Sequence, residues 1–173
     1  TEVDVLLGPE MKSTGEVMGI DKTFGRAFAK SQLATGIKLP KQGTTFISVK
    51  DSDKPKSVEI AKGLQDMGYQ IVATKGTADY LKLNGIDAEL IKKVKDGSPH
   101  CVEAIKSGRI DIVINTTFGE QAIEDSFSIR RSSLNKNLPY CTTIAGASAL
   151  LGGLKSIKEE DLSITTIQEY NKQ

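Results

Sequence analysis

Short aliphatic runs alternate with helix-like segments from residue 44 onward, and this alternation constrains the fold more than any other feature of the sequence. The clearest run is 110–114, the kind of segment that a central parallel strand requires because such a strand is buried on both faces. Four further strands are predicted at 44–49, 69–74, 88–91 and 140–143. Strands that alternate with helices predict an α/β fold of three layers, α/β/α, in which helices cover both faces of a mostly parallel sheet.

Apolar residues at helical spacing place the helices between these strands. Val58, Ala61, Leu64 and Met67 form the buried stripe of one helix, which ends at Gly68. Similar patterns predict helices at 22–33, around 77–83, from 99 to 106, at 123–134 and from 146 onward. Residues 35–43 are predicted to be a linker. The chain begins with Thr rather than Met, so we expect it to be a segment of a longer polypeptide.

Composition argues against several classes of protein. A formal net charge of +1 disfavours a nucleic-acid-binding protein, which normally carries a strong basic excess. No run approaches the ~18 apolar residues that a membrane span needs, and the N-terminus lacks the pattern of a signal peptide. Cys101 and Cys141 lack CxxC spacing, so we expect reduced thiols rather than a disulfide or a metal site. These features predict a cytoplasmic protein with no nucleic-acid or membrane partner.

The segment 73–78 directly follows the second predicted strand and precedes a helix; it reads Ala-Thr-Lys-Gly-Thr-Ala. Gly76 would let the backbone turn tightly and approach a ligand, while Thr74 and Thr77 supply hydroxyl donors. If Thr77 opens the helix, the amides of its first turn and the helix dipole favour an anion at one point. The segment therefore indicates a phosphate-binding turn, and an ordinary strand-to-helix turn with a threonine cap is an equal alternative.

Polar side chains gather where the predicted strands end. In an open α/β sheet, ligands bind outside the carboxyl ends of the strands, at the point where the strand order reverses. The side chains expected at this edge are hydroxyls, an amide and ammonium groups, with no acid at the strand ends themselves: Ser48, Lys54, Thr74, Thr77, Lys92, Lys93, Asn115 and Thr117. Such a set suits the binding of a phosphate and a sugar better than it suits proton transfer.

The candidates for catalysis each have a structural alternative, which we favour. His100 is the only histidine, and we expect it to cap a helix rather than to act as a base. Cys101 lacks an identifiable basic partner and is expected to be a buried, inert thiol. The acids at 124–125 suit the first turn of a helix, and the arginines at 130–131 suit a solvated helix face. We therefore assign no catalytic residue.

Several motifs resemble one family. They occur in order along essentially the whole chain, at 10–19 (EMKSTGEVMG), 73–78 (ATKGTA), 114–117 (INTT), 122–126 (AIEDS) and 129–132 (IRRS). These motifs look like the C-terminal end of the large subunit of carbamoyl-phosphate synthase. The resemblance implies that 1–36 is the C-terminal end of the ATP-grasp synthetase domain and that 37–173 is a methylglyoxal-synthase-like allosteric domain. It also implies a five-stranded parallel sheet in the order 3-2-1-4-5, preceded by an N-terminal extension.

The effector site of that family coincides with the polar residues at the sheet edge. Matching positions imply that the effector phosphate is bound by Lys54, Thr74, Thr77 and Lys93. They imply that the pocket is completed by Ser48, Gly76, Asn115 and Thr117. In enteric bacterial relatives the effectors are UMP and IMP, and ornithine binds where the matching residues here are Tyr140 and Thr142.

The sequence departs from the enteric pattern next to this site. Glu120 and Gln121 stand where the enteric form has two arginines, and Phe118 stands where it has a serine. The loss of positive charge leaves the identity of the effector open.

The resemblance also implies a parent enzyme and partners. The parent is a glutamine-hydrolysing ligase that uses ATP and Mg²⁺ or Mn²⁺ to make carbamoyl phosphate for pyrimidine and arginine biosynthesis, and no cofactor is expected in this segment. The implied partners are the catalytic domains of the same large chain, the glutaminase small subunit and a second copy of this domain. The alternative is a stand-alone enzyme like methylglyoxal synthase, which shares the fold. That enzyme needs an aspartate base, and here the corresponding positions fall near Ser98 and Phe118.

Overall fold

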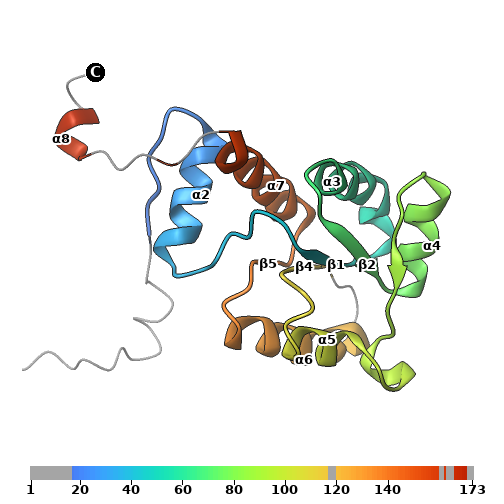
Figure 1. The fold of residues 1–173 in the computed structure, drawn as a ribbon. Coiled ribbons are helices and arrows are strands. Elements are labelled where there is room, and N and C mark those ends of the chain that lie inside the picture. The colour runs from blue at the N-terminus through green and yellow to red at the C-terminus, as the bar shows by residue number, and fades with distance from the viewer. Residues whose placement is uncertain (1–16, 117–119, 160–161, 163–165, 171–173) are drawn as a thin grey trace, which may run out of the picture.

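A five-stranded parallel sheet forms the centre of the molecule (Figure 1). The computed structural model describes residues 17–116, 120–159, 162 and 166–170, and for 120–125, 167 and 170 it describes the backbone alone. The strands lie in the order β3-β2-β1-β4-β5. They are β1 (Thr44–Ser48), β2 (Gln70–Ala73), β3 (Glu89–Leu90), β4 (Ile112–Asn115) and β5 (Tyr140–Cys141). All neighbouring strands are parallel, so the strand order that the resemblance implied is confirmed.

Helices cover both faces of the sheet, as the alternating pattern predicted (Figure 1). One face packs against α3 (Lys54–Asp66), α4 (Lys75–Leu83) and α7 (Ile144–Glu159). The other face packs against α5 (Cys101–Lys106) and α6 (Glu120–Asn135). Short 3-10 turns, η1 (Asp51–Asp53) and η2 (Val94–Asp96), lie after β1 and β3. Helix α2 (Phe24–Ala34) precedes the sheet, and α8 (Ile167–Tyr170) follows α7.

Aliphatic side chains on both faces of the central strands form two cores. Along β1, Phe46 is buried on the side of α5 and α6, while Ile47 is buried on the side of α3 and α7. Val113 and Ile114 alternate in the same way along β4. Each of these four side chains is at most 1% exposed, which explains why the central strands are apolar at successive positions. The two cores fix the sheet and therefore the position of its carboxyl edge.

The strand predicted at 110–114 begins two residues later, at Ile112, and Asp111 just before it contacts the start of β1. The Asp111 carboxylate Oδ2 accepts a hydrogen bond from the backbone N–H of Thr44 at 2.7 Å. Gly43 passes so close to this carboxylate that an added Cβ would overlap it, and its φ of 149° also favours glycine. Asp111 therefore holds the start of β1 beside the start of β4.

Helix α7 continues through a pair of glycines that the sequence alone does not explain. Glycine weakens a helix interior, yet Gly152 and Gly153 both lie within α7. Gly153 packs against α2, which lies beside α7 (Figure 1), and a Cβ added to Gly153 would lie 3.4 Å from the Gly25 carbonyl oxygen. A Cβ added to Gly25 of α2 would lie 2.5 Å from Ser156 Oγ and 2.8 Å from the Gly152 carbonyl oxygen. Part of the segment expected to belong to another domain therefore packs tightly against the sheet domain.

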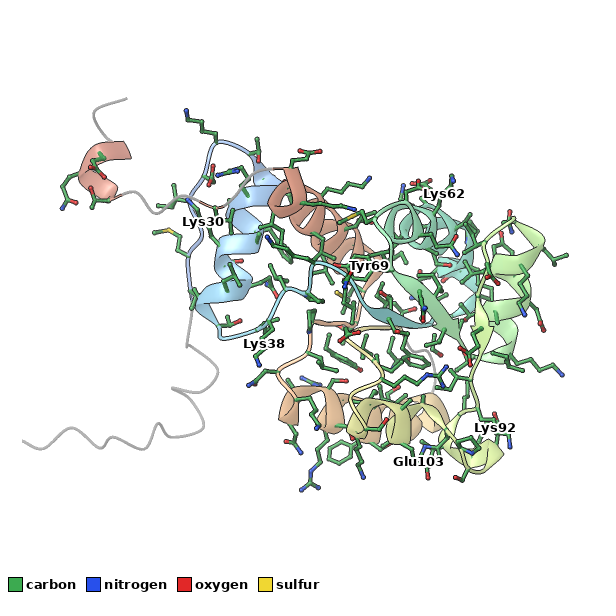
Figure 2. The ribbon with its side chains drawn as sticks, in the orientation of Figure 1. Lys30, Lys38, Lys62, Tyr69, Lys92 and Glu103 are labelled. Atoms are coloured by element: carbon green, nitrogen blue, oxygen red, sulfur yellow. The ribbon has the colours of Figure 1, made fainter. Side chains whose placement is uncertain are left out.

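An acidic residue attaches the segment before α2 to that helix. Asp21 Oδ2 lies 2.8 Å from Lys30 Nζ, and Oδ1 lies 3.1 Å from Arg26 Nε. The hydrogen bond from Lys30, with further contributions from Lys22 and Arg26, lowers the pKa of Asp21 to about 2. Figure 2 labels Lys30 on α2, close to the incoming chain. Residues 17–34 therefore form one ion-paired unit.

Candidate anion-binding site

The carboxyl ends of β1, β2 and β4 bring the predicted polar residues to one edge of the sheet. Ser48 ends β1 and Asn115 ends β4, and the two are register partners. Thr74 directly follows β2. Thr74 and Asn115 are each only 4% exposed, and Thr77 is 2% exposed. Because buried polar groups need hydrogen-bond partners, the contacts of these side chains define the site.

Hydroxyl groups hold the loop after β1 against the turn after β2. Ser48 Oγ lies 3.0 Å from Thr74 Oγ1, which joins the ends of the two strands. The backbone N–H of Val49 donates to Thr77 Oγ1 at 3.2 Å. The Thr77 oxygen thus accepts a hydrogen bond from the protein, while its own hydroxyl proton can be donated to a ligand. This arrangement fixes both loops before any ligand arrives.

The N-terminus of α4 opens at this edge. Thr74, rather than Thr77, is the N-cap residue, and its side chain makes no capping bond to the first turn. The Thr74 hydroxyl contacts Ser48 instead. A helix N-terminus without a side-chain cap offers backbone N–H groups and the positive end of the helix dipole to an anion. The alternative of a simple threonine cap therefore does not apply to this turn.

Gly76 lies in the first turn of α4 and keeps an ordinary helical backbone. The described glycines with positive φ do not include it, so the predicted tight glycine turn is wrong. An added Cβ at Gly76 would lie 3.5 Å from Lys54 Nζ, an ordinary contact distance. Gly76 therefore marks the place where α4 approaches the Lys54 ammonium group.

Lys54 is the first residue of α3, and an acid that the sequence analysis missed accompanies it. Lys54 Nζ lies 2.7 Å from Asp51 Oδ1 and 6.0 Å from the centroid of the Tyr80 ring. The hydrogen bond and charge of Lys54 lower the pKa of Asp51. Asp51 lies in η1, between the end of β1 and Lys54, and the strand-end prediction named only the lysine of this turn. The signal in the sequence is its i, i+3 spacing to Lys54.

Lys93 lies after β3, in a separate loop. Its backbone N–H donates to Asp96 Oδ2 at 3.2 Å. In the part of the chain that the structure describes, no hydrogen bond or ion pair joins its side chain to Lys54, Thr74 or Thr77. The neighbouring Lys92 donates from Nζ to the Ser98 carbonyl oxygen at 3.3 Å and so stabilises this loop (Figure 2). The contacts thus join Ser48 to Thr74, join Thr77 to the backbone of Val49 and place Lys54 beside Gly76, whereas the Lys93 side chain shares no described hydrogen bond or ion pair with them.

Asn115 connects the proposed effector pocket to Tyr140. Its Nδ2 donates to Ser126 Oγ at 3.1 Å and to Tyr140 Oη at 3.3 Å. Tyr140 is in β5, and the exposed Thr142 lies between β5 and α7. The residue expected to complete the effector pocket thus contacts one of the two residues expected to bind ornithine.

Several predicted positions lie outside the described residues. These are Thr117 and Phe118, and the side chains of Glu120, Gln121, Glu124 and Asp125.

His100 and Cys101 lie at the start of α5, where the sequence predicted a helix cap and a buried thiol. The Glu103 backbone N–H donates to His100 Nδ1 at 3.4 Å, so His100 caps α5 as predicted. Cys101 is fully buried. Cys141 lies on the other face of the sheet, where burial raises its pKa to about 12 and keeps the thiol protonated at neutral pH. Arg130 and Arg131 lie on the exposed face of α6.

Two kinds of feature are absent from the described part of the chain. No group of His, Cys, Asp and Glu side chains there has the arrangement of a metal site. None of its helices combines the length and the apolar composition that a bilayer crossing needs.

Comparisons with known proteins agree with the fold. The family model described as MGS-like domain matches residues 56–142. A crystal structure of methylglyoxal synthase from Elizabethkingia anophelis superposes with a TM-score of 0.54 and 18% sequence identity, covering 78% of this chain and 93% of that one. At this identity the likeness concerns the fold alone.

Curated relatives are similar over nearly the whole chain. The carbamoyl phosphate synthase large chain of Myxococcus xanthus is 55% identical over 97% of this chain and 16% of its own length. The protein from Methanopyrus kandleri named carbamoyl phosphate synthase large chain, C-terminal section, is 48% identical over 98% of this chain and 32% of its own length. The chain thus spans between about a sixth and a third of the length of these relatives.

Proposed function

The chain belongs to the MGS-like domain family, and from this premise we propose that it is an allosteric regulatory domain that binds a nucleotide effector such as UMP or IMP. The observation that carries the proposal is the group of hydroxyls around the uncapped N-terminus of α4, next to the Lys54 ammonium group. An effector phosphate would accept hydrogen bonds from Thr77 and from the first-turn amides of α4. Lys93 would reach it from the loop after β3, and Asn115 and Thr117 would contact the sugar or base.

We infer that the domain is part of a carbamoyl phosphate synthase large chain and controls its activity. The similarity to the large chains of Myxococcus xanthus and Methanopyrus kandleri supports this inference. The ligase reaction, with ATP and its Mg²⁺ or Mn²⁺ ions, would take place in domains outside this segment, in the cytoplasm. The glutaminase small subunit would be a partner of the whole enzyme, and ornithine would bind at Tyr140 and Thr142.

Signal transmission is assigned to the unit formed by residues 17–34. This unit packs on α7 through Gly25, and it exposes Met18 by 73% and Phe24 by 71%. Large apolar side chains at a surface are typical of contacts with other domains. An effector that binds one state of the enzyme better than the other by ~1–3 kcal/mol would shift its affinity roughly 5- to 150-fold.

Thermal unfolding in the presence of UMP and IMP tests the proposal. We expect either nucleotide to raise the melting temperature, because a ligand that binds only the folded state stabilises it. Thr77→Ala and Lys93→Ala should remove the ligand-induced rise, whereas Thr77→Ser, which keeps the hydroxyl, should retain most of it. Lys62→Ala is the matched control, since Lys62 pairs with Asp66 on the exposed face of α3. No response to either nucleotide at millimolar concentration would refute the assignment.

The second candidate is an enzyme like methylglyoxal synthase, which has a similar fold. Ser98, where that family is expected to have an aspartate, donates its hydroxyl to Glu103 near the start of α5. Purified protein incubated with dihydroxyacetone phosphate should therefore release no phosphate above the uncatalysed rate. Clear turnover would replace the regulatory assignment with the catalytic one.

A further inference from the structure

The ammonium group of Lys54 has an anionic partner within the protein. Asp51 Oδ1 lies 2.7 Å from Lys54 Nζ, at the distance of a charge-assisted hydrogen bond. A Cβ at Gly76 would lie 3.5 Å from the same nitrogen, so the ion pair lies against the first turn of α4. A carboxylate of the protein thus occupies one side of the cation that an incoming phosphate would use.

The two partners differ in how firmly they are held. The Lys54 side chain is 20% exposed and lies 6.0 Å from the centroid of the Tyr80 ring. The Asp51 side chain is 95% exposed and belongs to the short turn η1. An exposed ion pair of this kind contributes little to stability and can open at low cost. Displacement would therefore leave Lys54 in place and separate from it an Asp51 side chain that is already exposed to water.

We propose that Asp51 is a tethered competitor for the effector phosphate and sets the affinity and charge selectivity of the site, an inference that rests on the proposed function. A ligand must interact with Lys54 more favourably than the Asp51 carboxylate that it displaces. A phosphate monoester carries close to two negative charges at neutral pH and meets this condition. A ligand without a phosphate, such as a nucleoside, has no anionic group to pair with Lys54, whether or not Asp51 is present. The acid thereby restricts the use of Lys54 to ligands that carry a strongly charged anionic group.

The experiment compares the wild-type protein with Asp51→Asn and Asp53→Asn by calorimetric titration with UMP, IMP and uridine. Asp53→Asn is a matched control because it removes the same charge from the same turn. The Asp53 carboxylate lies 3.9 Å from Lys50 Nζ, and it makes no capping bond to α3. Asp51→Asn should fold normally, since the side chain is almost fully exposed.

We expect Asp51→Asn to bind the nucleotides roughly three- to tenfold more tightly, as removal of one nearby like charge in a screened site predicts. Asp53→Asn should change their affinity by less than about twofold, and uridine binding should be the same in all three proteins. Unchanged or weaker nucleotide binding by Asp51→Asn, or an equal gain in Asp53→Asn, overturns the inference while the proposed function stands. If neither the wild-type protein nor Asp51→Asn binds UMP or IMP, the proposed function fails and this inference fails with it.

Discussion

Asp21 shows how one carboxylate attaches the chain that leads into α2. Its side chain is only 5% exposed and faces the cationic groups of Arg26 and Lys30. We expect Asp21→Asn to lower the free energy of unfolding by about 1–2 kcal/mol near neutral pH, since the pairs are only partly shielded from solvent. Urea unfolding of the two proteins measures this difference. Asp66→Asn is the control, because Asp66 and its partner Lys62 are both exposed. The loss of this ion pair should change the free energy of unfolding by less than about 0.5 kcal/mol.

The same residue makes stability depend on pH in a defined direction. The folded protein lowers the pKa of Asp21 from 3.8 to about 2, so the folded state prefers the ionised carboxylate. Its contribution to stability is therefore complete above pH 3.8 and is lost as the pH falls through about 2. The difference in the free energy of unfolding between wild type and Asp21→Asn should become smaller as the pH falls from 3.8 to about 2. A difference that stays constant down to pH 2 would contradict the ion-pair account.

The packing of α2 on α7 depends on glycine at the contact. Gly25→Ala would place a methyl group 2.8 Å from the Gly152 carbonyl oxygen, so the helices must move apart. We expect a loss of about 1–3 kcal/mol, in spite of the higher helix propensity of alanine. Thermal or urea unfolding measures the loss.

A second glycine of the same interface is the control for this prediction. A Cβ at Gly152 would meet nothing within 4 Å, so Gly152→Ala should stabilise the protein by up to about 1 kcal/mol through helix propensity alone. If Gly25→Ala and Gly152→Ala changed the free energy of unfolding equally, close packing would not explain why residue 25 is a glycine.

The architecture of the whole molecule follows from its pattern of apolar residues. Continuous aliphatic strands separated by amphipathic helices predict a parallel sheet with two cores, and Phe46 and Ile47 occupy those two cores as expected. The strand-end rule likewise selected Ser48, Thr74 and Thr77, because parallel strands end at a common edge. Family resemblance, rather than periodicity, supplied the order of the strands.

Other features depend on contacts between distant segments and could not be predicted from local patterns. The role of Gly25 exists only because α2 lies against α7. Thr74 is the N-cap residue of α4 but makes no side-chain capping bond, and its hydroxyl contacts Ser48 across the strands instead. A role for Asp51 in the site could not be predicted, because that role depends on the position of Lys54 beside α4. Sequence patterns thus located the edge of the sheet, whereas the contacts within the site required the structure.

Binding of a nucleotide phosphate at the carboxyl edge of the sheet can be followed by a chemical-shift titration of backbone amides with UMP and IMP. For at least one of the two nucleotides, we expect saturable shifts concentrated at the N-terminus of α4, in the loop after β1 and at Lys93. Uridine should leave the α4 amides unchanged. Shifts confined to another surface, or none with either nucleotide at millimolar concentration, would contradict the account.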